Sequence, residues 1–193
     1  MPIIYLSPST QDWNPYVTGS GSEEYWMNRI ADAMEPYLRA NGIRYRRNDP
    51  DTSAAAAIRE ANSGYYDFYL ALHSNAIGKG EPQNTARGII ACYYPTSTGG
   101  QRGAELREIY PLPNRVSTRA TTTLGEVARS RFPAVLVEIG YHDNYADALW
   151  VEGHVEAIAQ RLVRALTEYF GLPFIHPMYP LQGIVRVDYG TLN

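Results

Sequence analysis

The chain has 193 residues, 45% of them hydrophobic, and its 17 basic and 20 acidic residues give a formal net charge of −3. A chain of this size forms one globular domain and buries roughly 70% of the surface that its unfolded form exposes, which excludes disorder. Slight acidity without a basic run argues against nucleic acid as a partner, and no stretch approaches the ~20 apolar residues of a membrane helix.

Short apolar runs alternate with helical spacings along the chain. Strands are predicted over residues 3–6, 43–47, 68–72, 88–94 and 134–139, and helices over residues 23–41, 52–62, 102–110 and 148–170. Pro36 predicts a kink or an early end in the first helix. The run 134–139 is continuously apolar except at Glu138, which is typical of a central parallel strand covered on both faces. The alternation predicts an α/β domain with a twisted, mostly parallel sheet flanked by helices.

Polar residues that follow strands are the first candidates for a site, because ligands bind at the carboxyl ends of strands in open α/β sheets. Glu138 ends an Ala-Val-Leu-Val run, where a carboxylate is costly to bury unless it is paired, protonated or close to a metal ion. A salt bridge to an arginine is the plainer interpretation. His73 directly follows the strand 68–72, where a histidine is as often a hydrogen-bonded loop residue as a ligand.

Two further residues join these candidates. Glu24 precedes Met27 by three residues and Ala31 by seven, which predicts that it shares the buried face of the first helix, whereas Glu23 is interpreted as a first-turn acid that stabilises the helix dipole. His142 lies four residues beyond Glu138 and either turns back toward the strand ends or bonds Asp143 in a turn. Two histidines with one or two carboxylates form a plausible catalytic zinc set, in which a carboxylate that does not bind the metal serves as general base.

Three segments resemble one known family in their order and spacing. The run from Ala134 to Asn144 resembles the catalytic-glutamate segment of zinc-dependent N-acetylmuramoyl-L-alanine amidases of the family-3 type, which are bacterial and phage cell-wall hydrolases. Residues 72–76 resemble that family's second histidine-ligand segment, and residues 24–28 its glutamate ligand on the first helix. The resemblance spans residues 1–172 and implies a zinc-dependent catalytic domain that acts on peptidoglycan, with Glu138 as the general base.

The chain departs from this family after the first strand. The family carries its first histidine ligand in a Pro-Gly-His-Gly loop, whereas this chain has Ser7-Pro8-Ser9-Thr10-Gln11 there. The resemblance therefore implies a ligand set in which His142 replaces the missing imidazole, giving Glu24, His73 and His142 around zinc. Gln11 and Asp143 are poorer zinc ligands and weaker substitutes.

The end of the chain predicts a second feature. Residues 173–182 are rich in proline and are interpreted as a linker, and residues 183–193 resemble the opening of a bacterial SH3-like module that binds cell wall. The start, Met1-Pro2 followed by an apolar strand, has no features of a secretory leader. We therefore expect release to the cell wall by a route without a leader, such as phage lysis or lysis of a mother cell.

The implied reaction is hydrolysis of the amide between N-acetylmuramic acid and the L-alanine of the stem peptide. Two alternatives remain open at this point. One is a zinc peptidase that acts on cell-wall peptides, and the other is a wall-binding protein that has lost its metal, which the missing histidine favours. The sequence predicts no oligomeric state.

Overall fold

The computed structural model describes residues 1–78, 85–106 and 116–178, in which strands and helices alternate. The strands are β1 (Ile3–Pro8), β2 (Arg44–Arg47), β3 (Phe68–Asn75), β4 (Ile89–Tyr93), β5 (Val116–Ala120) and β6 (Ala134–Tyr141). The helices are α1 (Glu23–Ala40), α2 (Ala54–Ser63), α3 (Thr98–Glu105), α4 (Gly125–Ala128), α5 (Tyr145–Gly153) and α6 (Val155–Phe170). The predicted module start at residues 183–193 and residues 179–182 of the predicted linker lie outside this description.

The described strands form one sheet in the order β2-β1-β3-β6-β4-β5. All neighbouring pairs are parallel except β4 and β6, which run antiparallel, so the predicted mostly parallel sheet is confirmed. β6 lies in the interior of the sheet and is covered on both faces, as its apolar sequence predicts.

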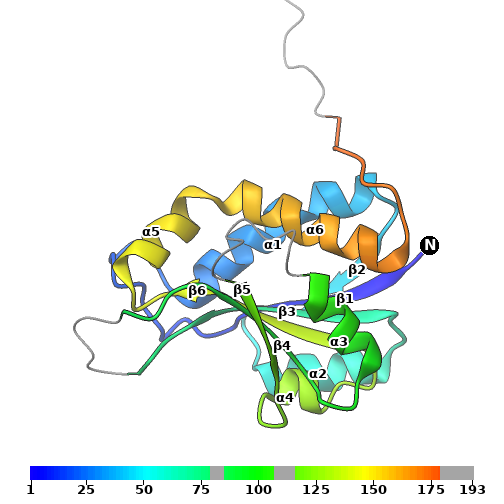
Figure 1. Ribbon diagram of the computed structural model, residues 1–193, viewed down its shortest axis with the longest axis horizontal. Helices are drawn as coiled ribbons and strands as arrows, with labels where there is room; N and C mark the ends of the chain where they lie inside the picture. Colours follow the sequence, from blue (N-terminus) through cyan, green and yellow to red (C-terminus); the bar gives the residue numbers. More distant parts are fainter. Residues whose placement is uncertain (79–84, 107–115, 179–193) are drawn as a thin grey trace, which may run out of the picture.

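Helices cover both faces of the sheet and make two hydrophobic cores. On one face, Leu72 and Val137 belong to a core that α1 and α6 complete with residues such as Met27 and Leu162. On the other face, Tyr69 belongs to a smaller core that α2 and α4 cover. Figure 1 shows α1, α5 and α6 above the sheet and α2 and α4 below it. Because side chains alternate along a strand, odd-numbered residues of β3 and even-numbered residues of β6 face α2 and α4.

Several elements differ from the sequence-based expectation. α1 continues through Pro36 to Ala40, because Met34, Tyr37 and Leu38 on its buried stripe pack into the core. The predicted helix 148–170 is two helices that meet at His154, an exposed residue. The short elements β5 and α4 have no strong periodicity and were not predicted. None of the helices in the described ranges combines the length and the hydropathy that a membrane span requires.

The segment after β6 is held in place by Asp147, which is completely buried in α5. Its carboxylate accepts hydrogen bonds from Arg87 Nε at 2.7 Å, from the Gly88 backbone N–H at 2.8 Å and from the Tyr141 backbone N–H at 3.2 Å. These bonds join the end of β6, the start of α5 and the segment that enters β4. The loop that carries His142 therefore has a fixed position beside the sheet.

Gly100 in α3 offers a test of this packing. A Cβ added there would lie 2.7 Å from the backbone oxygen of Ala134, which cannot shift without disturbing β6. We expect Gly100→Ala to lower the free energy of unfolding by about 1–3 kcal/mol, measured by urea denaturation. Gly153→Ala is the control, because its added Cβ would meet no atom within 4 Å. Equal unfolding midpoints for the two variants would contradict the described packing.

Candidate active site

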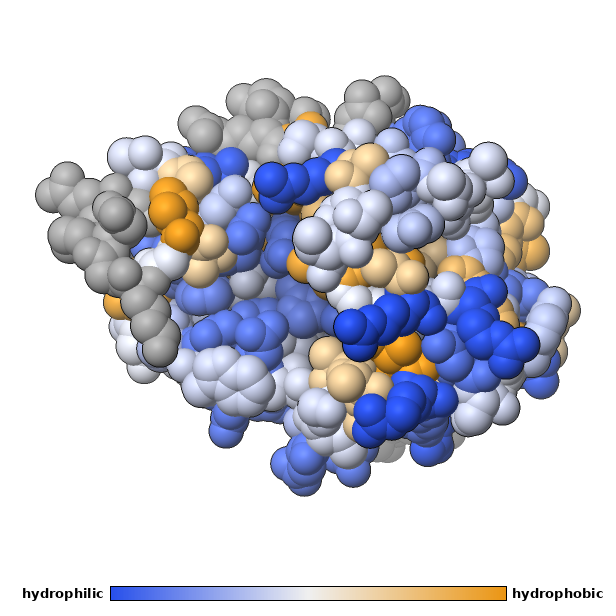
Figure 2. All heavy atoms as spheres, turned by 90° about the horizontal axis from the view of Figure 1, so that it is seen from below, coloured by the Kyte–Doolittle hydropathy of each residue, from blue (hydrophilic) through white to orange (hydrophobic). Residues whose placement is uncertain are grey.

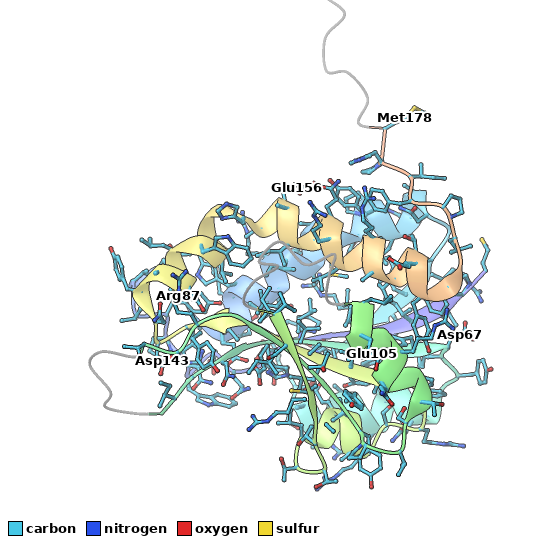
Figure 3. The ribbon with its side chains drawn as sticks, in the orientation of Figure 1. Asp67, Arg87, Glu105, Asp143, Glu156 and Met178 are labelled. Carbon is cyan, nitrogen blue, oxygen red and sulfur yellow. The ribbon has the colours of Figure 1, made fainter. Side chains whose placement is uncertain are left out.

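The candidate side chains gather where β1, β3 and β6 end. These strands run parallel, so their carboxyl ends lie at one edge of the sheet. Figure 3 shows the two ends of the sheet: Asp67, which precedes β3, lies at the opposite end of the molecule from Asp143, which follows β6. At the Asp143 end, β3 contributes His73, β6 contributes Glu138 and the first turn of α1 contributes Glu23.

Glu23 is the acid of α1 that reaches this edge. Ser22 caps the helix by accepting a hydrogen bond from the Tyr25 backbone N–H, and Glu23 follows it with only 1% of its surface exposed. Its Oε1 lies 2.8 Å from His73 Nδ1, and its Oε2 accepts a hydrogen bond from Asn14 Nδ2 at 2.9 Å. Burial raises the pKa of the Glu23 carboxyl, but the hydrogen bond and the charge of His73 outweigh it and hold the pKa below its usual range.

The expectation that Glu24 lies on the buried face of α1, with Glu23 outside it, is wrong. Glu24 is only half-buried, and its Oε1 accepts a hydrogen bond from Asn28 Nδ2 at 3.1 Å. Spacing from Met27 permits either residue, because positions i−4 and i−3 both border the same helical stripe. The direction in which the first turn crosses the strand ends selects Glu23.

Glu126 is a second buried acid at His73, and the sequence reasoning missed it. It lies in the short helix α4 and is 4% exposed. Its Oε2 lies 2.7 Å from His73 Nε2, while its Oε1 accepts hydrogen bonds from Ser7 Oγ at 2.7 Å and Tyr69 Oη at 2.8 Å. The available signal was an acid in the short segment Leu124-Gly125-Glu126-Val127, which precedes the strand that carries Glu138.

His73 is therefore bracketed by carboxylates on both ring nitrogens. Burial lowers the pKa of the imidazole, but its hydrogen bonds to Glu126 and Glu23, with the charges of both acids, raise the pKa well above its usual value. The hydrogen bonds and charge of His73 also hold the pKa of Glu126 below its usual range, against the effect of burial. The three side chains form a buried ion-paired group in which each acid orients the ring from one side.

His142 lies at the same edge of the sheet, close to Glu23. Of the two positions that the sequence left open, this is the one in which the chain turns back toward the strand ends. It is 7% exposed, and its Nδ1 lies 4.0 Å from Glu23 Oε2 and 3.1 Å from the Ser74 backbone oxygen. Its ring stacks on buried Tyr16 with centroids 5.9 Å apart. His142 therefore lies in a fixed orientation close to one oxygen of the Glu23 carboxylate, while the other oxygen contacts His73.

Gln11 enters the group from the loop where the family carries a histidine. Its Nε2 lies 3.3 Å from His73 Nδ1 and 3.4 Å from Glu23 Oε1. Thr10, the position that corresponds most nearly to the missing histidine, is buried. Asp143 accepts a hydrogen bond from the Ile77 backbone N–H at 2.8 Å.

Glu138 lies next to His73 in the sheet, because the two residues are partners in the β3–β6 register and face the same side. It borders a cavity of about 310 Å³ that is also lined by Asn75, Ile90, Cys92, Arg119, Thr121, Thr123 and Leu124. Burial raises the pKa of the Glu138 carboxyl to about 7, although the positive charge of His73 opposes this. A carboxyl with this pKa exchanges a proton near neutral pH, as a general acid or base requires.

The donor set at this edge suits zinc in its chemistry. Two imidazole nitrogens, His73 Nδ1 and His142 Nδ1, face the two oxygens of the Glu23 carboxylate, and these are the ligand types that catalytic zinc takes. On the far side of His73, Glu126 is placed as the carboxylate that a ligating histidine usually bonds through its other nitrogen. As the side chains stand, no group of three or more His, Cys, Asp or Glu within the described ranges is spaced to hold a metal ion.

Comparison with known proteins places the chain in a family. The profile of the N-acetylmuramoyl-L-alanine amidase family, Amidase_3, matches residues 11–168. The chain belongs to this family. The resemblance predicted from the sequence is thereby confirmed.

Individual proteins are similar to the chain in sequence or in fold. The chain is 28% identical over 155 residues to N-acetylmuramoyl-L-alanine amidase LytC of Bacillus subtilis (strain 168), and the match covers 75% of this chain but only 30% of that protein. Among solved structures, the catalytic domain of CwlV from Bacillus (Paenibacillus) polymyxa var. colistinus aligns with a TM-score of 0.77 and 16% identity, covering 90% of this chain and 100% of that one. The N-acetylmuramoyl-L-alanine amidase of Clostridium difficile 630 aligns with a TM-score of 0.76 and 19% identity, covering 88% and 97%.

The raised pKa of Glu138 predicts a stability change that does not depend on activity. The folded chain keeps this proton up to about pH 7, whereas the unfolded chain loses it near its ordinary pKa of 4.5. The folded state thus binds more protons between these values, and the free energy of unfolding falls as the pH rises from 4.5 to 7. We expect Glu138→Gln to be more stable than the parent above pH 7, by on the order of 1–3 kcal/mol.

This difference is measured by urea denaturation between pH 4 and pH 8. It should vanish near pH 4, where the parent is protonated in both states. Glu168→Gln on the exposed face of α6 is the control and should show no such trend. A Glu138→Gln variant whose stability parallels that of the parent at all pH values would contradict the described burial.

Proposed function

We propose that this chain hydrolyses the amide between the lactyl group of N-acetylmuramic acid and the L-alanine of the peptidoglycan stem peptide, with zinc as cofactor. The observation that carries the proposal is the register of β3 and β6, which sets Glu138 beside His73 within a chain of the amidase family. The site of action would be the cell wall.

Glu23, His73 and His142 are the residues that would hold zinc. Glu23 takes the ligand role that the family resemblance gave to Glu24, because its carboxylate and not that of Glu24 meets the imidazoles. Glu126 would hold His73 in orientation through Nε2 and leave Nδ1 on the side of the other donors. In such a site a bound zinc ion supplies Lewis acidity, which polarises a carbonyl and lowers the pKa of water.

Glu138 performs the proton transfers of the proposed reaction. Its carboxylate removes a proton from the attacking water, and the same carboxyl then donates a proton to the nitrogen of the leaving L-alanine. Its pKa of about 7 suits both steps, since the group gives up and regains a proton close to neutral pH. Its partly buried position limits the competing solvation of the carboxylate by bulk water.

A metal-free wall-binding protein is the second candidate. It is favoured by one observation, namely that both ring nitrogens of His73 already have carboxylate partners. The metal content of the purified protein separates the two functions, because the binding protein requires none.

Matched variants of α1 test the metal site. We expect Glu23→Gln to weaken zinc binding at least about 10-fold, because it replaces a carboxylate that faces two imidazoles, whereas Glu24→Gln should bind zinc as the parent does. Competition with a chromogenic chelator measures both affinities. The reverse order would return the ligand role to Glu24, and a parent that binds no zinc would favour the metal-free protein.

The same titration shows whether His142 or Gln11 is the third zinc ligand. His142→Ala should weaken zinc binding and Gln11→Ala should leave it near the parent value, because an imidazole is the better zinc ligand. A loss in Gln11→Ala alone would assign that position to the glutamine.

Digestion of purified cell wall tests the reaction. The parent protein should release new L-alanine amino termini, and Glu138→Gln should bind zinc normally but lose activity by 100-fold or more, on the order of the usual loss of a general base. Amino-terminal analysis of the products provides the measurement. Free D-alanine instead would indicate a peptidase, and full activity of the variant would refute the role of Glu138.

A further inference from the structure

The cavity beside Glu138 extends away from the proposed zinc ligands, toward β4 and β5. Cys92 faces it from β4, and Arg119 faces it from β5, where the two residues are partners in the register. The cavity opens on the face that α2 and α4 only partly cover. Figure 2 shows this face of the molecule as largely hydrophilic, with a hydrophilic hollow near its middle.

Arg119 is the cation of this cavity. Arg46, Arg47 and Arg87 each form an ion pair with a nearby acid, whereas Arg119 forms none with any acid of residues 1–78, 85–106 and 116–178. The positive charge of Arg119 acts on the groups of the cavity. Burial raises the pKa values of Glu138 and Cys92, and the charge of Arg119 opposes this rise in both. An unpaired guanidinium at the rim of a cavity next to a reacting group is placed to bind an anion of the substrate.

The lining next to Arg119 supplies further polar groups. Thr121 and Thr123 bond each other through their hydroxyls at 3.1 Å, and Thr121 Oγ1 also accepts a hydrogen bond from the Thr123 backbone N–H at 3.2 Å. One of the two hydroxyl hydrogens is therefore available to a ligand. Asn75 adds an amide at the end of β3. A carboxylate near Arg119 would therefore meet a charge-assisted bond and neutral donors, while Glu138 disfavours a second anion at its own end of the cavity.

We propose that this cavity binds the stem peptide on the leaving-group side of the scissile amide, with Arg119 holding the carboxylate of the residue that follows L-alanine. The inference rests on the proposed function, since Glu138 is taken to mark the scissile bond. A volume of about 310 Å³ holds only one or two residues, so the anion must lie close to that bond. The sugar side is excluded as the occupant, because its hydroxyl and amide groups offer a guanidinium no charge.

Two peptides that differ in one carboxyl group test the proposal. The probes are L-Ala-γ-D-Glu-L-Lys and its amidated counterpart L-Ala-D-isoGln-L-Lys, each titrated calorimetrically into the parent, Arg119→Ala and Arg119→Lys. We expect the parent to prefer the carboxylate form by about 10-fold, Arg119→Ala to lose that preference, and Arg119→Lys to keep part of it because lysine lacks the bidentate fork. Arg161→Ala, on the exposed face of α6 across the sheet, is the control and should behave as the parent.

Turnover of muramyl peptides with the same two second residues completes the test. Arg119→Ala should raise KM for the carboxylate substrate about 10-fold, leave KM for the amidated one unchanged and leave kcat near the parent value. Equal binding of both peptides by the parent, or equal losses on both in Arg119→Ala, would overturn the proposal. A parent that discriminates between the peptides but cleaves neither substrate would refute the proposed function while retaining Arg119 as the carboxylate site.

Discussion

The site depends on one interaction, the bracketing of the His73 imidazole by two buried carboxylates. Glu23 reaches Nδ1 from the first turn of α1, and Glu126 reaches Nε2 from α4. Each acid alone would be expensive to bury, and together they require the positive ring between them. Ser7, Tyr69 and Asn14 donate the remaining hydrogen bonds, so the group is fully partnered without solvent. This network fixes the relative positions of two helices and the central strand β3.

The parallel sheet then determines what lies next to His73. β3 and β6 pair in parallel, and residues that are partners in the register face the same side of the sheet. Glu138 is the register partner of His73. Glu138 has no hydrogen-bonded cation of its own among the described residues, and burial consequently raises its pKa to about 7. One edge of the sheet thus holds acids of two kinds: Glu23 and Glu126, which stay ionised, and Glu138, which exchanges its proton near neutral pH. Environment, and not residue type, separates these roles.

The chain also shows how an amidase fold accommodates a changed first loop. Ser7-Pro8-Ser9-Thr10-Gln11 carries no imidazole, yet its residues still serve the site: Ser7 bonds Glu126, and Gln11 contacts both His73 and Glu23. His142 lies near the Glu23 carboxylate oxygen that does not contact His73, and it is held by Ser74 and Tyr16. The loop after β1 therefore orients the acids, and the imidazole nearest to Glu23 besides His73 comes from the end of β6.

The alternation of apolar runs and helical spacings by itself determined the fold class, the central position of residues 134–139 and the gathering of His73 and Glu138 at one edge, because strand burial and strand polarity are local properties of the chain. For His142 the sequence left two positions open, and the structure selected the one beside Glu23. The tertiary structure decided what local pattern could not. Glu23 and Glu24 are equivalent by helical spacing, and only the angle at which α1 crosses the strand ends selects Glu23. Glu126 and Arg119 lie in short, weakly patterned elements. Glu126 meets His73, and Arg119 lies at the cavity beside Glu138, through packing and sheet pairing with residues distant in sequence, which no spacing along the chain can express.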